Sequence, residues 1–424
     1  MYVRQLGKGL QALGWKVTVA APSMDESEHS YIHDGLSVYR YPVLLQPCKE
    51  EVRSTVPPKY LDIFTTWLKE NKPDIVHFHS RTRGCGFYHF KVVNQLGIPF
   101  VLTVHSADFM CVAGTARLWG IYPCDGKLNE YRCTACWLTN RGVPLWWLAW
   151  LFSRVPIAIA RKMRNRDNKL STLLSMRQLF IEREEREWYL FENTERIIAV
   201  SKWLYNVLKV NKVPEQKLYF CPHGLEPRVV KPKRRADFEI PSILRIGFIG
   251  RFNYVKGLHI LISAIKRLPR HMHIEFMVYG RTKTTEEEQY IQSMQKLAKN
   301  DNRIRFCGEL TDKNRQDVFM NLDILAVPSI WLETGPYVVL EAFSMGVPVL
   351  GSNLGGITEL VTNRVNGLLV EPGNVRAWAK AISWIYEHKQ VLGDWSRHMP
   401  HIRSNTDVVN DMVRIYEDIL IKGN

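Results

Sequence analysis

Two basic residues, Arg251 and Lys256, stand in a glycine-flanked run directly after an apolar stretch that predicts a buried strand. The run extends from Gly250 to Gly257, and a helix is expected to begin after it. The start of a helix carries partial positive charge and favours acidic residues, yet this run contains none. Cations at such a position favour a bound anion, and a phosphate group is the expected ligand. The alternative is that both side chains extend into solvent.

Two glutamates, Glu333 and Glu341, flank the start of another helix that follows a second apolar strand. Pro336 suits the first helical position and Gly335 can cap the helix, so Glu333 is expected in the loop at its positive end. Glu341 is expected one turn after Tyr337 on the same face. A lone glutamate in such a place usually complements the helix dipole. Two carboxylates can instead accept hydrogen bonds from sugar and ribose hydroxyls, while amides at the helix start hold a phosphate.

Four of the eight cysteines fall within residues 111–136, and the last two form a C-x-x-C pair. They are Cys111, Cys124, Cys133 and Cys136. Four thiolates at loop-like spacing could bind a structural zinc ion. Reduced or disulfide-paired cysteines are the alternatives. The other four are scattered, and buried free cysteines are common.

A tryptophan-rich apolar stretch, Val143–Ala160, precedes a basic run. Arg154 and two prolines interrupt the stretch, so it is expected to lie on a membrane or against protein rather than cross a bilayer. Residues 141–180 hold eight Lys or Arg and one Asp, a net charge of +7. Aromatic side chains beside cations are typical of interfacial binding, which predicts peripheral membrane contact through residues 143–170. The alternative is a helical hairpin that packs on its own domain.

The elements that must position these residues alternate between strands and helices, which predicts parallel sheets covered on both faces. A helix is expected at Tyr2–Leu13, and another carries the apolar positions from Leu258 to Leu268. The expected strands of the first half are Trp15–Ala21, Asp74–His79, Phe100–His105, Arg196–Ser201 and Lys217–Pro222. Those of the second half are Leu244–Ile249, His273–Val278, Arg303–Phe306, Ile324–Pro328 and Pro348–Gly351.

Length and charge limit the classes of protein to which this chain can belong. The chain has 424 residues, 46% hydrophobic and 23% charged, which fits two globular domains and excludes a disordered or fibrous protein. The 57 Lys and Arg exceed the 42 Asp and Glu by 15, which favours an anionic partner. Nucleic acid is not expected, because no base-reading motif is recognisable and the cations cluster elsewhere. Met1–Gly9 lacks the apolar core of a secretory signal, which favours a cytoplasmic protein, and the membrane contact expected of residues 143–170 would place it at the inner face of the membrane.

The ordered set of motifs resembles the family-four retaining glycosyltransferases, which have the GT-B fold. Glu333 and Glu341, seven residues apart, look like the E-x7-E element of that family, in a Trp-x-Glu-x-x-Pro variant. The run Gly250–Gly257 is similar to its donor-diphosphate motif. Further matches follow in the expected order: Gly355-Gly356-Ile357, Asn366-Gly367-Leu368, Asp74-Ile75-Val76-His77, Thr103-Val104-His105, Ala199-Val200-Ser201 and Pro222-His223-Gly224. The resemblance covers nearly the whole chain.

This resemblance implies an α/β protein with two Rossmann-like doubly wound domains facing a central cleft. It implies transfer of a sugar from a UDP- or GDP-sugar to a glycan or lipid-linked acceptor in cell-surface polysaccharide synthesis, with retention of configuration and without a metal cofactor. Arg251 and Lys256 would stabilise the departing diphosphate, and His105 would face the donor sugar. Glu333 would bind sugar hydroxyls and Glu341 the ribose. Gly250, Gly335, Pro336 and Tyr337 complete the expected donor-binding set.

The implied domains are an N-terminal acceptor-side domain (1–225), a linker (226–242), a C-terminal nucleotide-sugar domain (243–403) and a C-terminal helix (404–424) that could pack back on the first. Residues 108–190 are expected to form a Cys-rich and Trp/basic insertion. Two departures stand out. The family usually has a glycine three residues after the first glutamate, whereas here Gly335 lies two residues after Glu333 and Pro336 lies three residues after it. The chain also begins at a helix, without the strand that normally precedes it. A nucleotide-sugar epimerase or hydrolase on the same fold is the alternative function.

Overall fold

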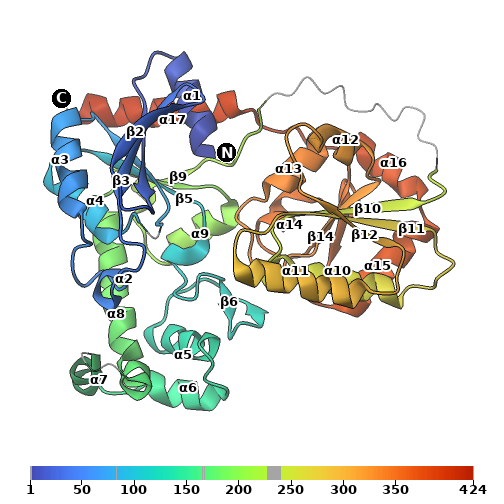
Figure 1. The fold of residues 1–424 in the computed structure, drawn as a ribbon, viewed down its shortest axis with the longest axis horizontal. Coiled ribbons are helices and arrows are strands. Elements are labelled where there is room, and N and C mark those ends of the chain that lie inside the picture. Colours follow the sequence, from blue (N-terminus) through green and yellow to red (C-terminus); the bar gives the residue numbers. More distant parts are fainter. Residues whose placement is uncertain (1, 83, 165, 167, 227–239, 424) are drawn as a thin grey trace. The chain divides into compact units, whose positions relative to one another are not determined.

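The computed structural model describes residues 2–82, 84–164, 166, 168–226 and 240–423, which form two compact units (Figure 1). The first unit comprises Met1–Glu226 together with Ser404–Asn424, and the second comprises Pro227–Arg403. Most of the predicted linker, residues 226–242, lies outside the described residues. The chain therefore leaves the first unit, completes the second and returns to the first.

The first unit is built on a four-stranded parallel sheet whose strand order is β4-β5-β8-β9. The apolar strand β5 is buried on both faces, as its run of valine, leucine and phenylalanine predicts. Leu102 packs with helices α3, α4, α8 and α9 on one face, whereas Val101 packs with α1 and α17 on the other. The bounds of these elements are β4 Val76–His79, β5 Phe100–Val104, β8 Arg196–Ala199, β9 Leu218–Phe220, α1 Tyr2–Ala12, α3 Leu61–Asn71, α4 Phe87–Gln95, α8 Lys169–Asn193, α9 Lys202–Val210 and α17 Asn405–Gly423.

A separate three-stranded sheet, in the order β1-β3-β2, completes the early part of this unit. Strand β1 (Thr18–Ser23) pairs in parallel with β3 (Leu36–Pro42), and β2 (His29–His33) pairs with β3 in antiparallel fashion. The sequence predicted one strand here, Trp15–Ala21, which is shifted from β1 by two to three residues. Strand β2 was missed because all five of its residues are exposed and show no apolar alternation.

Between β5 and β8 lies a helical region that carries the clustered cysteines and tryptophans. Its elements are η1 Ala107–Phe109, the short β6–β7 hairpin (Arg117–Leu118, Tyr122–Pro123), α5 Glu130–Asn140, α6 Trp146–Ser153, α7 Ile157–Arg164 and α8. Leu138 of α5, Ala149 of α6 and Met176 of α8 are buried together in a small core. Among the described residues, no helix is both long enough and apolar enough to cross a membrane. The stretch Val143–Ala160 is instead split between α6 and α7.

The second unit is a six-stranded parallel sheet in the order β12-β11-β10-β13-β14-β15. One face is covered by α10, α11 and α15, and the other by α12, α13 and α14. Winding runs outward from β10 in one direction and resumes from β13 in the other, which is a doubly wound Rossmann-like order. The bounds are β10 Leu244–Ile249, β11 Ile274–Tyr279, β12 Ile304–Gly308, β13 Ile324–Val327, β14 Val349–Ser352, β15 Gly367–Val370, α10 Leu258–Arg267, α11 Thr285–Ala298, α12 Arg315–Met320, α13 Tyr337–Ser344, α14 Gly356–Leu360, α15 Val375–Glu387 and α16 Gln390–Arg397.

Candidate functional site

The carboxyl ends of β10 and β13 lie side by side at the point where the strand order reverses, which is where open parallel sheets bind ligands. Lys256 ends a short turn, η4 (Tyr254–Lys256), after β10. Gly257 follows with φ +74°, and a Cβ atom there would lie 1.9 Å from the carbonyl oxygen of Pro328. Only glycine therefore lets the loop after β10 approach the end of β13 so closely.

This close approach joins Lys256 to Glu333. Lys256 Nζ lies 2.6 Å from Glu333 Oε1, and Ser329 Oγ donates to the same oxygen at 2.7 Å. Glu333 is only 6% exposed. Burial alone raises the pKa of Glu333, but Lys256 and Ser329 outweigh that effect and hold the pKa below its ordinary value. The site thus contains a charged carboxylate and its cation, both largely withdrawn from water.

The loop that carries Glu333 is shaped by the glycine pair after β14. Gly356 donates its backbone N–H to the carbonyl oxygen of Glu333 at 2.6 Å. A Cβ atom on Gly356 would lie 2.8 Å from the amide nitrogen of Gly335, so a side chain cannot replace this contact. Helix α13 begins at Tyr337, one residue later than predicted, and Pro336 is its cap residue with φ −70° and ψ 110°. The positive end of α13 still follows the glutamate loop directly.

The second glutamate, Glu341, lies within α13 and is 6% exposed. Arg315, at the start of α12, donates through Nη1 to Oε1 at 2.9 Å and to Oε2 at 3.1 Å. This arginine was not identified from the sequence, because 26 residues separate it from Glu341 and neither local spacing nor a motif connects them. Only the packing of α12 beside α13 brings the pair together.

Arg251 and Gly250 complete the loop after β10. Arg251 is exposed, and among the described parts of the chain it forms no ion pair. Gly250 donates its N–H to the carbonyl oxygen of Tyr279 at 3.1 Å. The site therefore combines one cation committed to a buried carboxylate, Lys256, with one that is accessible to an anion, Arg251.

His105 lies in the first unit, directly after β5. Its Nε2 is 3.2 Å from Nδ1 of His79 at the end of β4, and its ring stacks on that of His223 at a centroid distance of 5.8 Å. The Tyr2 ring meets it edge-on at 4.8 Å. Burial lowers the pKa of His105 to about 4 and that of His223 to about 3. These rings are neutral at physiological pH, and no local pattern in the sequence indicates that His77, His79, His105 and His223 share one cluster.

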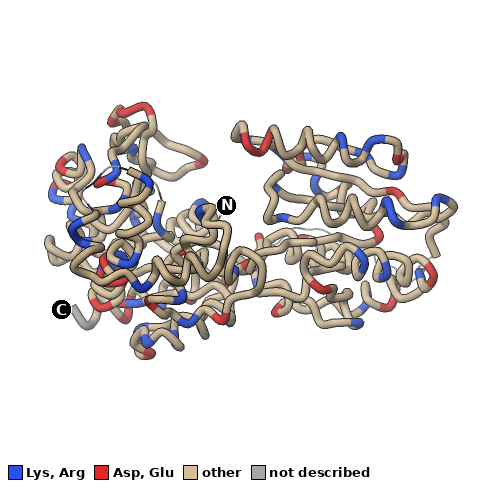
Figure 2. The backbone as a smooth tube through the Cα atoms, turned by 90° about the horizontal axis from the view of Figure 1, so that it is seen from below, with Lys and Arg blue, Asp and Glu red and all other residues tan. Residues whose placement is uncertain are grey.

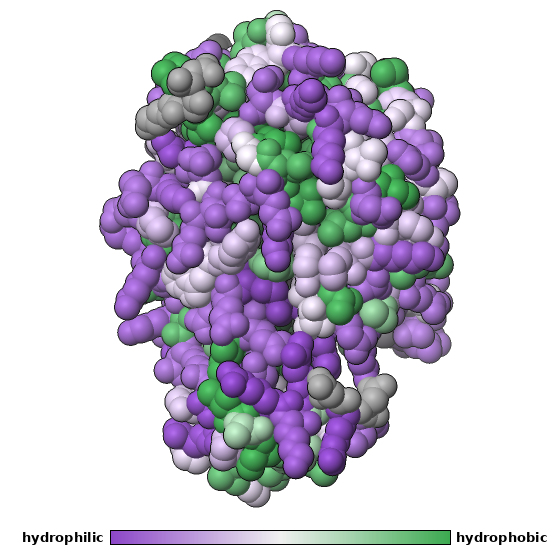
Figure 3. All heavy atoms as spheres, turned by 90° about the vertical axis from the view of Figure 1, so that its left-hand side faces the viewer, coloured by the Kyte–Doolittle hydropathy of each residue, from purple (hydrophilic) through white to green (hydrophobic). Residues whose placement is uncertain are grey.

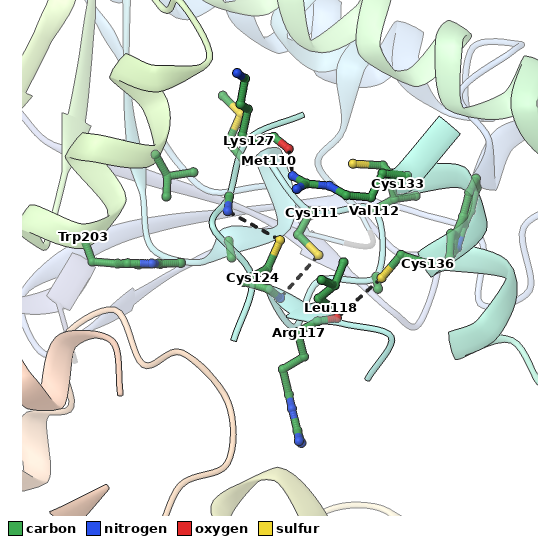
Figure 4. A pocket seen from close by; sticks show the side chains of 17 residues that line it. Met110, Cys111, Val112, Arg117, Leu118, Cys124, Lys127, Cys133, Cys136 and Trp203 are labelled. Carbon is green, nitrogen blue, oxygen red and sulfur yellow. Dashed lines mark hydrogen bonds between the residues drawn. The ribbon is translucent and has the colours of Figure 1, made fainter. Parts of the chain in front are cut away.

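The four clustered cysteines line a single pocket between η1, the β6–β7 hairpin and α5 (Figure 4). Each sulfur is 3.2–3.4 Å from a backbone amide that donates to it. The pairs are Ala116 with Cys111, Gly126 with Cys124, Asn129 with Cys133, and Trp119 with Cys136. All four are free thiols. As they stand, no three His, Cys, Asp or Glu side chains in the described ranges are arranged to hold a metal ion.

Helix α6 exposes a row of apolar side chains. Trp146, Trp147, Trp150 and Leu151 share one face, and Trp146 is the most exposed at 66%. Arg154 lies over the Trp150 ring at 3.9 Å, and the last turn of α7 adds three further cations. Figure 3 shows hydrophobic side chains among hydrophilic ones at the end of the first unit that α7 occupies. Elsewhere Lys and Arg are spread along both units (Figure 2).

Comparison with protein families gives two matches. Residues 1–203 match the glycosyl transferase 4-like domain, and residues 232–399 match glycosyl transferases group 1. An uncharacterized glycosyltransferase of Methanocaldococcus jannaschii is 26% identical over 210 residues, which is 47% of this chain and 51% of that protein. The amylovoran biosynthesis glycosyltransferase AmsK of Erwinia amylovora is 26% identical over 216 residues, 49% of this chain and 51% of AmsK. The chain thus spans about half the length of these relatives.

Solved structures resemble the chain over nearly its full length. Sucrose-phosphate synthase from Thermosynechococcus elongatus gives a TM-score of 0.66 at 20% identity, covering 99% of this chain and 93% of that one. Anabaena HepE in complex with UDP-glucose gives 0.59 at 16% identity, covering 91% and 86%. At such identities the likeness establishes the fold, and the predicted fold class, an α/β protein with two Rossmann-like domains, is confirmed.

Proposed function

We propose that this chain, which matches a glycosyl transferase 4-like domain and glycosyl transferases group 1 and has a GT-B fold, transfers a sugar from a nucleotide-diphosphate-sugar donor to an acceptor. The observation that carries the proposal is the buried pair of Lys256 and Glu333 at the strand switch point, beside the exposed Arg251. A diphosphate needs cations, and a sugar needs a charged acceptor of hydrogen bonds.

Each group at this site has a defined part in the proposed reaction. Arg251 and Lys256 neutralise the diphosphate as its negative charge grows in the transition state, so that no metal ion is needed. Glu333 accepts hydrogen bonds from hydroxyls of the sugar, and Lys256 keeps it ionised. Glu341, oriented by Arg315, accepts from the ribose hydroxyls. HepE has been solved with UDP-glucose, which supports a UDP-sugar as the first donor to test.

Retention of configuration belongs to the same proposal. A neutral His105 can accept a hydrogen bond from a donor-sugar hydroxyl without adding charge, because its pKa of about 4 keeps the ring unprotonated at pH 7. The proposed acceptor is a glycan or a lipid-linked molecule. AmsK, named for amylovoran biosynthesis, supports a place for this chain in polysaccharide synthesis.

The test is a screen of UDP- and GDP-sugars by thermal shift, followed by transfer to supplied glycan acceptors. The expected result is stabilisation by one donor class and transfer with retained configuration in the presence of EDTA. Glu333→Ala is expected to abolish transfer while the fold is kept, whereas Glu309→Ala, an exposed carboxylate of the same unit, is the matched control. Formation of an epimer or of free sugar only would instead establish the epimerase or hydrolase function and refute the transferase.

We also propose that the α6 face binds the surface of a membrane and so brings the enzyme to a lipid-linked acceptor. Four large apolar side chains are exposed on one face of α6, beside cations of α7 that attract anionic lipid. Co-sedimentation with phosphatidylglycerol vesicles is expected for the wild type and lost when Trp146 and Trp147 are both changed to serine. Leu13→Ser, a similarly exposed apolar residue outside α6, serves as the control. Equal sedimentation of all three proteins would refute this contact.

We also propose that the four cysteines bind a structural zinc ion, which requires their sulfurs to move together, since as they stand no three such side chains in the described ranges are arranged to hold a metal. Backbone N–H groups that donate to sulfur stabilise thiolates and are frequent second partners of metal ligands. Burial raises the pKa of Cys133 to about 11, so a cation must displace its proton. Purified protein is expected to contain one zinc per chain, lost in Cys133→Ser but not in Cys307→Ser. Four reactive thiols without bound metal, or a disulfide, would refute the site.

A further inference from the structure

A second pocket in the first unit lies beyond the carboxyl end of β4 and shares no lining residue with the site on the second unit. Its volume is about 1340 Å³, including the part that opens to solvent. It is lined by Pro47, Lys49, Val52, Arg53 and Ser54, by Arg81 after β4, and by side chains of α4, α5 and α8. Because every lining residue belongs to the first unit, the pocket exists whatever the placement of the second.

The charge of this pocket is strongly one-sided. Among the described residues that line it, six are cations and only Glu187 is a carboxylate. The cations are Lys49, Arg53, Arg81, Arg141, Arg183 and Arg186. They come from four separate segments of the chain, so a local run of basic sequence does not account for their convergence.

Two of the arginines are neutralised within the protein. Arg81 forms an ion pair with Glu187, and Arg183 Nε lies 3.9 Å from the same carboxylate. Both arginines also donate to the backbone carbonyl of Asp108, whose carboxylate is 3.7 Å from Arg81 Nη2. Glu187 is 7% exposed, which fixes these two guanidinium groups at the inner wall.

The other arginines leave a surplus of positive charge. Arg186 is partly buried, and among the described residues it has no carboxylate within ion-pair distance. Burial lowers the pKa of Arg186, and burial together with Arg81 does the same for Arg183. Arg141 stacks over the Trp137 ring at 5.0 Å. Glu182 and Glu187 attract Arg186 without outweighing the effect of its burial, and the side chains that line the cavity carry a net positive charge that favours an anion.

We propose that this pocket binds the phosphate groups of an anionic acceptor, with a diphosphate ester as the best fit. The proposal rests on the transferase function, since it names the chemical class of the molecule that receives the sugar. Guanidinium groups form paired hydrogen bonds to phosphate oxygens, and Arg53, Arg141 and Arg186 line the pocket in addition to the two arginines that Glu187 holds. Trp137 belongs to α5 and Arg141 caps its carboxyl end, and the exposed tryptophans of α6 follow a few residues later. A lipid chain attached to the diphosphate therefore has an apolar surface nearby.

The experiment measures binding of farnesyl diphosphate and of inorganic diphosphate to the full chain by calorimetry. Both are expected to bind, and changing Arg141 and Arg186 to glutamine, singly and together, is expected to weaken binding tenfold or more in the double variant. Lys169→Gln, which removes a charge from α8 outside the pocket, should bind as the wild type does. Tighter binding of farnesyl diphosphate than of inorganic diphosphate identifies a lipid-linked source, whereas equal binding identifies a soluble phosphorylated one.

Two further measurements separate this pocket from the donor site. Arg251→Gln is expected to weaken nucleotide binding and leave farnesyl diphosphate binding intact, and the Arg141/Arg186 variants should do the reverse. If Arg251→Gln removes diphosphate binding while the pocket variants do not, the anion sits at the donor loop and the proposal is overturned. If nucleotides fail to bind but diphosphate still depends on Arg141 and Arg186, the pocket stands and the transferase function falls.

Discussion

Replacing Lys256 by methionine removes the cation from a carboxylate that stays buried. At 2.6 Å, the attraction between Lys256 and Glu333 is worth about 6 kcal/mol for an effective dielectric constant of 20, before desolvation of both groups is subtracted. Side-chain exposures of 20% and 8% place the pair well inside the protein. Loss of one partner of such a pair costs about 3–5 kcal/mol, because the other charge is left unpaired. We expect a loss of this size in the free energy of unfolding of Lys256→Met at pH 7.5.

The loss of unfolding free energy in Lys256→Met should depend strongly on pH. In the wild type the pKa of Glu333 is lowered, so the pair contributes stability above the unfolded pKa of about 4.3 and loses it as the pH falls through the folded value. In Lys256→Met, burial without the cation raises the pKa of Glu333, so the variant loses stability as the pH rises above about 4.3. The difference between the two proteins should therefore be smallest near pH 4 and largest near pH 7.5.

Urea unfolding between pH 4 and pH 8 measures this difference. The control is Arg281→Met, which breaks a pair in the same unit whose side chains are 52% and 50% exposed. That loss should stay below about 1 kcal/mol, because water screens an exposed pair. A penalty for Lys256→Met that equals the control, or that does not change with pH, would show that the pair with Glu333 does not govern the carboxylate.

Three other changes test separate parts of the structure. Arg315→Met should cost about 3 kcal/mol in urea unfolding and weaken nucleotide binding, because Glu341 stays buried without its charged donor; no change in either would refute its role. Gly257→Ala should cost about 3 kcal/mol or more, since its Cβ would meet a carbonyl oxygen at 1.9 Å, whereas Gly308→Ala, at φ +80° in open space, should cost about 1–2 kcal/mol. His105 should remain neutral in NMR titrations down to about pH 5, and stability from its neutral ring should fall as the pH drops from about 6.5 to 4; titration near pH 6.5 would contradict its burial.

Much of the fold follows from local pattern. Strands such as β5 and β10 are mostly apolar, interrupted only by Thr103 and Arg245, and burial on both faces of a parallel sheet favours such runs. The glycines and cations after β10 could also be identified, because chemistry and backbone conformation restrict those positions. The observed strand boundaries differ from the predicted ones where the apolar pattern is weak, as at β1, which starts three residues after the predicted Trp15.

Contacts between distant segments could not be read in this way. The sequence predicts a phosphate near Lys256, which stays a prediction, but it does not predict the contact of Lys256 with Glu333, 77 residues away, because β10 and β13 are neighbours only once the sheet is wound. The contact of Arg315 with Glu341 and the shared pocket of the six cations could not be predicted for the same reason. These side chains act together only because the fold brings them close in space, and their spacing along the chain does not indicate this.

The return of the chain to the first unit has a consequence for synthesis on the ribosome. Helix α17 follows the whole second unit in the chain, yet Val409 and Met412 of α17 share a core with Leu6 and Leu10 of α1. During translation the second unit has emerged in full before α17 is available, so that face of the first unit stays uncovered meanwhile. Domains generally fold as they emerge, and exposed apolar surface invites aggregation. The nascent first unit is therefore the part of this protein that we expect to depend on chaperones.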